Sequence, residues 1–433
     1  MTLLIKNAKI LQNDNTLLKN IFIEDDKIIE ISDKEFDAEA IIDAKNNLVI
    51  PGCIDTHVHF RDFGHEHKED WISASNAALS GGVTSVIDMP NNLDPIDSKE
   101  KWKNKLKMIS EKALVNFSAY IMVTEKNVDE INSMTNFPGV KLFFGNTTGS
   151  NKTADVDYIF KKLRKDILIV VHAEDNEIMA ENKNKLEKND NVKYHSIIRD
   201  SRAEYIAVKK IINLSKKYKN KIHIAHVSSK ETIDLIKKAK DQEIKITCET
   251  CPHYLFLDKS CYDKLGNFAK MNPALKSKKD RDALIRAVKK GIVDIISTDH
   301  APHTIKEKQK PYPDAPSGVT GIETMLALLL NEVNKGTFSL KRLIEITSKN
   351  QAEIFRIKNK GKIEKDYDAD LTILDLNLNK KVENKKLFTK PGWSPFDAWS
   401  LLGWPVATIV NGKVVYEKGI ITAKTQGNKI EFV

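Results

Sequence analysis

Residues 54–64 read IDTHVHFRDFG and directly follow the apolar run NNLVIPGC. Polar Asp55, His57, His59 and Arg61 alternate in this segment with apolar side chains. Because successive side chains of a β-strand point to opposite faces, a strand here would place all four polar groups on one side. Polar groups are costly to bury without partners, so this face is expected to line a functional site.

The composition indicates a globular protein with one large domain and a smaller one. The chain has 433 residues, 41% of them hydrophobic and 30% charged. No apolar run is long enough to span a membrane, and Lys6 and Lys9 interrupt the start as they would not in a signal peptide. Four cysteines are too few for a disulfide framework, which favours a reducing cytoplasm. The net charge of +9 fits solvated lysine-rich helices, and no nucleic-acid partner is expected because the basic stretches lack interleaved aromatic residues.

Apolar, strand-like runs alternate with helical patterns through the middle of the chain. Examples are the strand candidates VTSVIDMP, DILIVVHAE and KIHIAHVSS and the helical stretches SKETIDLIKKAK and KDRDALIRAVKK. Near-continuous Val, Ile and Leu strands between helices are typical of a buried parallel sheet. About eight such units match a closed, TIM-like (β/α)₈ barrel of the α/β class. A doubly wound open sheet is the alternative, because alternation alone does not show closure.

Both ends of the chain read as short strands separated by turns. LLIKNAKIL and NIFIEDDKIIEIS near the start, and ADLTILDL and VATIVNGKVVYEKG near the end, are of this kind. They are predicted to pair into one small sheet or β-sandwich. The expected domains are therefore a barrel over 51–350 and a small β domain built from 1–50 and 351–433.

Polar residues recur at or near the C-terminal ends of the predicted strands. In a barrel these ends form one mouth, where active sites are built. A single histidine at such a position is commonly a structural residue, whereas several histidines and an aspartate that converge are hard to explain by packing. The pattern therefore predicts a metal site in the mouth. The polar residues are His57, His59, Arg61, Asn91, Lys141, His172, His226 and Asp299.

Histidine and carboxylate ligands suit zinc, and a catalytic zinc site keeps one position open. The set suffices for two ions, which lie about 3.5–4 Å apart in such centres and need a bridging anion. A buried lysine can lose its proton, and a neutral amine can react with carbon dioxide to form a carbamate. We therefore expect Lys141 to be the bridge, with an ordinary ion pair to a nearby acid as the alternative.

Seven motifs in this order and spacing resemble the class I dihydroorotases of the amidohydrolase superfamily: HVHFR, DMPN, VKLFFGNTTG, VHAED, HIAHVSS, KMNPAL and STDHAPH. The resemblance covers most of the chain, including the tail motifs DADL and WSPF. It implies two zinc ions, one held by His57, His59 and Asp299 and the other by His172 and His226, with carboxylated Lys141 between them. One departure is Phe63, where the family usually has proline.

The resemblance also implies a small-molecule substrate and its binding residues. These are His59, Arg61, Asn91, Asn272 and His303, with the Ser317–Gly318 backbone closing over the substrate. Asp299 would transfer the proton. The implied reaction is reversible, zinc-dependent cyclisation of N-carbamoyl-L-aspartate to (S)-dihydroorotate and water in pyrimidine synthesis.

Other functions stay open at this point. Hydantoinases, dihydropyrimidinases and allantoinases share the metal ligands, but Arg61 and Asn91 favour a substrate whose ring carries a carboxylate. A non-catalytic scaffold for other pyrimidine-pathway enzymes is the second alternative, which an intact ligand set disfavours. A homodimer, or an association with aspartate transcarbamoylase, is compatible with the family.

Three further stretches allow two interpretations each. The sequence HEH at 65–67 has metal-ligand spacing but lies in a charged segment, so solvated histidines are expected. Cys248 and Cys251 form a CxxC pair, but Pro252 follows at once, so ordinary residues are expected rather than a redox pair. The polar, proline-rich segment 304–318 is either a mobile lid over the site or a plain surface loop.

Overall fold

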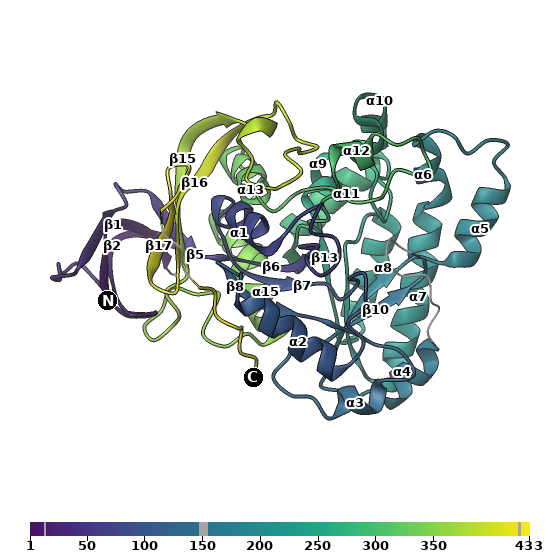
Figure 1. The fold of residues 1–433 in the computed structure, drawn as a ribbon, viewed down its shortest axis with the longest axis horizontal. Helices are drawn as coiled ribbons and strands as arrows, with labels where there is room; N and C mark the ends of the chain where they lie inside the picture. Colours follow the sequence, from purple (N-terminus) through teal and green to yellow (C-terminus); the bar gives the residue numbers. More distant parts are fainter. Residues whose placement is uncertain (13, 147–154, 423–425) are drawn as a thin grey trace.

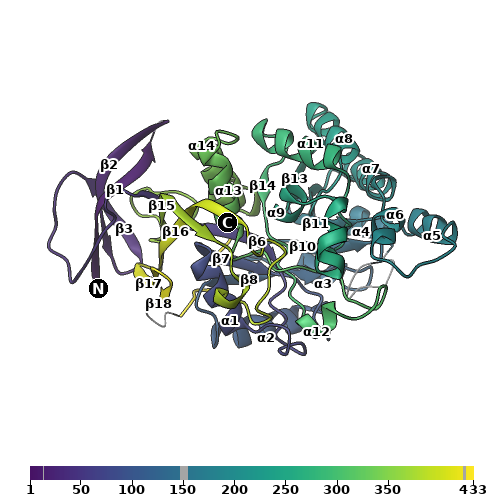
Figure 2. The same cartoon turned by 90° about the horizontal axis from the view of Figure 1, so that it is seen from above.

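The structure is a computed structural model that describes residues 1–12, 14–146, 155–422 and 426–433. Strands and helices in alternation form a barrel on one side of the molecule (Figure 1). The N-terminal strands, in purple, and the C-terminal strands, in yellow, lie side by side at the other end in both views (Figure 1, Figure 2).

The barrel strands follow one another in chain order and pair in parallel. They are β6 (Cys53–Val58), β7 (Val83–Asp88), β8 (Asn116–Ala119), β9 (Ile121–Met122), β10 (Val140–Phe144), β11 (Leu168–Ala173), β12 (Lys221–Ile224), β13 (Ile246–Thr250) and β14 (Ile295–Ile296). Only Tyr120 separates β8 from β9, so the two act as one strand.

Residues just beyond β14 close the circle. His300 pairs in parallel with Val58 of β6, and the N–H of His59 donates to the carbonyl oxygen of His300 at 2.8 Å. With β8 and β9 taken as one, the described residues form eight parallel strands in a ring. The predicted (β/α)₈ barrel is confirmed, and the open-sheet alternative is wrong.

Helices connect and cover the strands. They are α1 (Trp71–Ser80), α2 (Lys99–Ser110), α3 (Val128–Asn132), α4 (Val156–Lys162), α5 (Asn176–Asn184), α6 (Lys193–Ile198), α7 (Ser201–Tyr218), α8 (Lys230–Asp241), α9 (Pro252–Phe256), α10 (Tyr262–Leu265), α11 (Lys278–Lys289), α12 (Ile305–Lys308), α13 (Met325–Asn334), α14 (Leu340–Ile344) and α15 (Asn350–Phe355). Several begin at a side-chain cap: Asp70 accepts the first free N–H groups of α1, and Ser229 does so for α8.

A nine-stranded sheet combines strands from both ends of the chain, in the order β18-β17-β16-β15-β5-β1-β2-β3, with β4 paired to β1. Its strands are β1 (Thr2–Gln12), β2 (Asn15–Glu24), β3 (Lys27–Ser32), β4 (Ala40–Asp43), β5 (Leu48–Pro51), β15 (Leu371–Lys381), β16 (Ser400–Val410), β17 (Lys413–Glu417) and β18 (Ile420–Ile421). The two ends meet where β5 and β15 pair antiparallel. The exact domain boundaries at 50/51 and 350/351 stay predictions.

The last residues of the chain close the amino-terminal end of the barrel. Ile430 is buried in one cluster with Ile54, Ile87 and Phe355, and its N–H donates to the carbonyl oxygen of Phe117 at 2.8 Å. This end is therefore filled with apolar side chains, and the opposite end, at the carboxyl ends of the strands, is the one available for a site.

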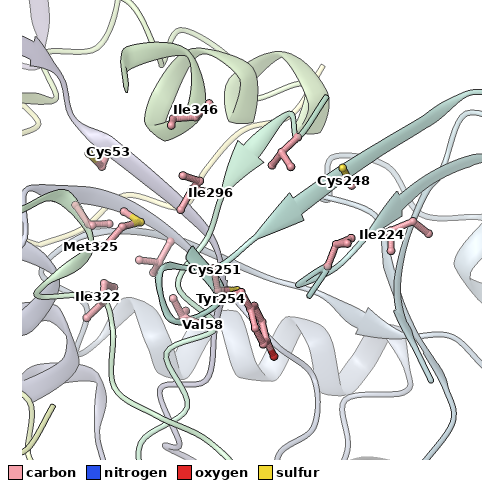
Figure 3. Packing of buried hydrophobic residues seen from close by; sticks show 14 of the residues in the cluster. Cys53, Val58, Ile224, Cys248, Cys251, Tyr254, Ile296, Ile322, Met325 and Ile346 are labelled. Atoms are coloured by element: carbon pink, nitrogen blue, oxygen red, sulfur yellow. The ribbon is translucent and has the colours of Figure 1, made fainter. Parts of the chain in front are cut away.

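The CxxC pair lies in the apolar core. Figure 3 shows Cys248 beside Ile224, apart from Cys251, which lies next to Tyr254. Both are buried free thiols, and burial raises the pKa of Cys248 to about 12. Because the thiolate is the reactive form of cysteine, this environment supports the interpretation as ordinary residues.

Candidate active site

Residues 54–64, IDTHVHFRDFG, are only partly a strand. β6 ends at Val58, so His59 and Arg61 lie in the loop beyond it, where Arg61 has a φ of 63°. Asp55 accepts hydrogen bonds from the N–H of Thr298 at 3.1 Å and from its hydroxyl at 2.5 Å. The expectation that one strand face carries all four polar groups is therefore wrong. Asp55 instead fastens β6 to the segment after β14.

One cavity at the carboxyl ends of the strands collects almost all the predicted site residues. Its lining includes His57, His59, Arg61, Asn91, Lys141, His172, His226, Asn272, Asp299, Ser317 and Gly318. Phe143 and Ala301, which the sequence analysis did not single out, also line it. His303 lies behind this wall, with its Nε2 3.3 Å from Nη2 of Arg61 and 3.0 Å from the carbonyl oxygen of Ser317.

Three residues form a group that could hold a metal ion, which we call the first subsite: His57, His59 and Asp299. Nε2 of His57 lies 3.3 Å, and Nε2 of His59 3.1 Å, from the same Oδ1 of Asp299. All the candidate ligand atoms are within 4.8 Å of one another. Two imidazoles and one carboxylate are a ligand set typical of zinc.

His172 and His226 form a neighbouring pair, the second subsite. Nδ1 of His172 lies 2.9 Å from Nε2 of His226, somewhat less than the spacing of about 3.3 Å between two nitrogens that share one tetrahedral zinc ion at about 2.0–2.1 Å each. The rings of His57 and His226 are 5.4 Å apart between centroids, so the two subsites adjoin.

Lys141 reaches the same cavity from β10. Its Nζ is buried and, among the described residues, has no hydrogen-bond partner. Burial lowers the pKa of this ammonium to about 8. The alternative of an ordinary ion pair is not supported, because no carboxylate of the described chain pairs with Lys141 within 4.0 Å.

Two carboxylates that sequence reasoning missed hold the histidines. Oε1 of Glu249 accepts a hydrogen bond from Nδ1 of His57 at 2.5 Å, and Oε2 of Glu174 lies 3.2 Å from Nε2 of His172. Arg199 pairs with the same oxygen of Glu174. Their positions carried a signal, because Glu249 is the last residue but one of a largely buried strand and lies between the two cysteines, and Glu174 stands two residues after His172.

Comparison with known proteins assigns this arrangement to a family. The model of the amidohydrolase family matches residues 48–415. The chain belongs to the amidohydrolase family. The dihydroorotase of Methanosphaera stadtmanae is 37% identical over 422 residues, covering 95% of this chain and 96% of that protein. The dihydroorotase of Pyrococcus furiosus is 34% identical over 430 residues, covering 98% and 95%.

Solved structures of other amidohydrolases share the fold. L-Hydantoinase (dihydropyrimidinase) from Arthrobacter aurescens has a TM-score of 0.93 at 28% identity and covers 99% of both chains. Dihydropyrimidinase from Brevibacillus agri has a TM-score of 0.88 at 24% identity, over 99% and 98%, which shows the fold alone. None of the helices in the described parts of this amidohydrolase combines the length and apolar character needed to cross a bilayer.

Phe63 gives this amidohydrolase a turn that proline could not adopt. Its φ is 72°, whereas proline is confined to about −65°. Its N–H also donates to Oε1 of Glu66 at 2.8 Å, a bond that proline cannot form. The loop after Arg61 therefore differs in conformation from one built on the family's usual proline.

Buried lysines hold the segment 304–318. Nζ of Lys308 donates to the carbonyl oxygens of Lys270 at 3.1 Å, of Pro316 at 2.9 Å and of Gly318 at 2.9 Å. Nζ of Lys270 donates to two more carbonyls of the segment. In this amidohydrolase the segment is thus tied to the mouth by two lysines, and its movement as a lid stays a prediction.

The Ser317–Gly318 backbone already has protein partners. The N–H of Gly318 donates to the carbonyl oxygen of Lys270 at 2.9 Å, and the carbonyl oxygen of Ser317 accepts from Nε2 of His303 at 3.0 Å. Closure of the Ser317–Gly318 backbone over a substrate stays a prediction. It would require this backbone to exchange its hydrogen bonds with the protein for hydrogen bonds with the substrate. Trp393 of the WSPF motif donates from Nε1 to the carbonyl oxygen of His303 at 2.7 Å, so the tail supports the mouth.

The HEH stretch stays outside the cavity. His67 is largely exposed, and its Nε2 lies 3.3 Å from Oε1 of Glu307 on α12. Lys68 approaches the same carboxylate at 3.4 Å. His67 therefore serves a surface contact with α12. The end of the VKLFFGNTTG motif, residues 147–149, lies outside the described residues.

Proposed function

We propose that this amidohydrolase is a dihydroorotase. It would close N-carbamoyl-L-aspartate to (S)-dihydroorotate and water, and reopen that ring, in pyrimidine biosynthesis. Similarity to dihydroorotases along nearly the whole chain supports the proposal. The observation that carries it is the environment of Arg61, because a ring carboxylate distinguishes dihydroorotate from the neutral ring of dihydrouracil.

Arg61 is a buried cation that lines the cavity without a carboxylate of its own. Its side chain is 8% exposed and is oriented by the carbonyl oxygen of Pro302, 3.2 Å from Nε. Within the described part of the chain it forms no ion pair, and burial lowers its pKa to about 10. A buried charge is costly until it is paired. The planar guanidinium matches a carboxylate, so a substrate that carries one would supply the missing partner.

The donor sets of the two subsites support binding of two zinc ions. Lys141, with a buried amine and no hydrogen-bond partner among the described residues, would bridge them as a carbamate. When bound, the ions supply Lewis acidity for the ring carbonyl and make water nucleophilic near neutral pH. The protein itself would contribute by holding the six ligand side chains in the mouth of the barrel, with Arg61 beside them.

Asp299 is the proposed proton carrier. Although burial alone would raise its pKa, the imidazoles of His57 and His59 hold it well below its ordinary value. It is therefore ionised near neutral pH and able to accept a proton during hydrolysis. In ring closure the same carboxyl group would deliver that proton, since the two directions share one path. Its φ of 46° keeps the carboxylate at the mouth in an uncommon backbone conformation.

Asn91 and Asn272 are proposed to complete substrate binding. Both line the cavity with Arg61. His195 donates from Nε2 toward the carbonyl oxygen of Met271 at 2.9 Å and toward Oδ1 of Asn272 at 3.0 Å. The contact with His195 holds the amide of Asn272 at the wall of the cavity, where it would contact the substrate.

The test is an assay of purified protein with dihydroorotate, dihydrouracil, hydantoin and allantoin side by side. A hydantoinase is the second candidate, because the Arthrobacter aurescens L-hydantoinase shares the fold at a TM-score of 0.93. We expect turnover of dihydroorotate well above that of the other three. A preference for dihydrouracil or hydantoin would replace the proposed function with the second candidate, and no turnover of any of them would leave the scaffold alternative.

A reducing cytoplasm is the proposed location, on the argument that all four cysteines are free thiols. Self-association, or association with aspartate transcarbamoylase, would suit a pathway enzyme. Sedimentation of the protein alone and mixed with that enzyme tests both.

A further inference from the structure

Glu249 is a fully buried carboxylate at the carboxyl-terminal part of β13. Three groups from two other parts of the barrel approach it. Nδ1 of His57, on β6, lies 2.5 Å from Oε1, and the backbone N–H of His226, just after β12, lies 3.2 Å from the same oxygen. Nε2 of His223, on β12, lies 3.3 Å from Oε2. One side chain thus contacts a ligand residue of each subsite.

The contact with His57 decides which ring nitrogen is available to a metal ion. Oε1 of Glu249 accepts a hydrogen bond from the backbone N–H of His226, so this oxygen acts as an acceptor toward its other partner, Nδ1 of His57. Nδ1 of His57 must therefore carry its proton, which leaves the lone pair on Nε2, the nitrogen that faces Asp299 across the first subsite.

The contact with His226 holds a backbone conformation that is costly for this residue. The φ of His226 is 38°, in the left-handed region that residues other than glycine seldom adopt. The hydrogen bond from its N–H to Glu249 fixes this turn. This backbone conformation directs Nε2 of His226 toward His172, whose Nδ1 is 2.9 Å away in the second subsite.

We propose that Glu249 is a positioning residue that couples the two metal subsites, setting the proton position of His57 in one and the backbone of His226 in the other. Glu174 contrasts with it, because His172 is the only one of the six proposed ligand residues that its carboxylate contacts, and its other partner is Arg199. Removing Glu249 is therefore expected to weaken both subsites, and removing Glu174 only one. The inference rests on the proposed metal pair but not on the proposed substrate.

The experiment compares Glu249→Gln and Glu174→Gln with a matched control, Glu204→Gln. Glu204 is equally buried but accepts hydrogen bonds from Ser228 and Ser229 and from no histidine. Each protein is stripped with a chelator and titrated with Co²⁺ in bicarbonate buffer, by calorimetry and by the visible absorbance of the bound ion. Metal binding is the readout, so no activity is needed.

We expect two binding events in the wild type and in Glu204→Gln. Loss of a group that orients a ligand typically lowers metal affinity by about 10–100-fold. That loss should affect both events in Glu249→Gln and one event in Glu174→Gln. A Glu249→Gln protein in which either event keeps its wild-type affinity would overturn the coupling.

Two further measurements keep the result interpretable. Far-UV circular dichroism checks that each variant is folded, and Glu249→Asp, which keeps the charge and shortens its reach, replaces Glu249→Gln if that protein does not fold. Glu249→Asp should also weaken both events, and wild-type affinity in either one contradicts the proposal. Wild-type protein that binds no Co²⁺ would contradict the proposed function as well, whereas intact dihydroorotate turnover with independent subsites would contradict the coupling alone.

Discussion

Nζ of Lys308 lies 2.9 Å from the carbonyl oxygen of Gly318, which binds the start of the segment 304–318 to its end. Lys308→Met would leave the carbonyl oxygens of Pro316 and Gly318 without this donor, whereas that of Lys270 keeps the N–H of Gly318. We expect a loss of about 2–4 kcal/mol in unfolding free energy, measured by urea unfolding, and faster hydrogen exchange in the segment. Lys306→Met, on the exposed face of the same helix, is the control and should change neither. Fast exchange across 304–318 already in the wild type would favour the mobile lid instead.

Arg61→Met tests the proposed substrate carboxylate. The variant loses a charge-assisted contact with the substrate. Its kcat/KM for dihydroorotate should therefore fall by a factor that corresponds to about 2–4 kcal/mol of lost transition-state stabilisation. Metal content should stay at the wild-type level, because Arg61 contacts no ligand atom. Arg281→Met, whose guanidinium pairs with Asp258 and Asp282, controls for loss of an arginine elsewhere. Unchanged turnover of dihydroorotate in Arg61→Met would count against the dihydroorotase assignment.

Lys141→Ala tests the bridge. Elemental analysis of the wild type should give about two zinc-type ions per chain, and chelation should abolish activity. Without the lysine most activity should be lost, and short carboxylic acids should restore part of it by occupying the space of the carbamate. Lys105→Met serves as a comparison, since Lys105 is equally buried but donates to the carbonyl oxygen of Met89 outside the cavity. Full activity of Lys141→Ala would refute the bridging role.

Asp299→Asn separates proton transfer from metal binding. The amide keeps one oxygen for coordination but cannot accept a proton at neutral pH, so both reaction directions should slow by about 10²–10⁴-fold. Metal content should fall less than in His57→Asn. In the wild type, hydrolysis should need a basic group and ring closure a protonated one. Near-normal rates in Asp299→Asn with both ions bound would move the proton shuttle, with His303 as the next residue to test.

The metal-free protein should lose stability in acid through Glu174. Burial would raise the pKa of this carboxyl, but Arg199 and His172 lower it to about 2 from 4.5. A depressed pKa contributes stability that is complete above about pH 4.5 and is lost as the pH falls toward 2. By urea unfolding, the free energy of unfolding of the wild type should therefore exceed that of Glu174→Gln by on the order of 3 kcal/mol at pH 6. This difference should become smaller in acid. A difference in unfolding free energy that does not change with pH would show that Arg199 and His172 do not stabilise the ionised form of Glu174.

Local patterns in the sequence were sufficient for the barrel and for most of the site. Period-2 alternation and apolar runs identify strands, because side chains alternate across a strand whatever it pairs with. Polar residues at strand ends identify the mouth, because the carboxyl ends of parallel strands lie together. His172 and His226 could be named for this reason, although 54 residues separate them. The resemblance to dihydroorotases added Asn272 and His303, which no local pattern marks.

Tertiary structure decided which groups meet across the fold. Glu249 stands 192 residues from His57, and nothing in either segment indicates that their side chains bond. Phe63 reads as a plain substitution until its φ and its bond to Glu66 show a different turn. Lys308 likewise reads as one more surface lysine in a charged stretch. The sequence alone determined which positions carry polar residues where a core is expected. Which groups pair with the buried charges was settled by the tertiary structure, because these groups come close only when the barrel closes and the chain ends fold back on it.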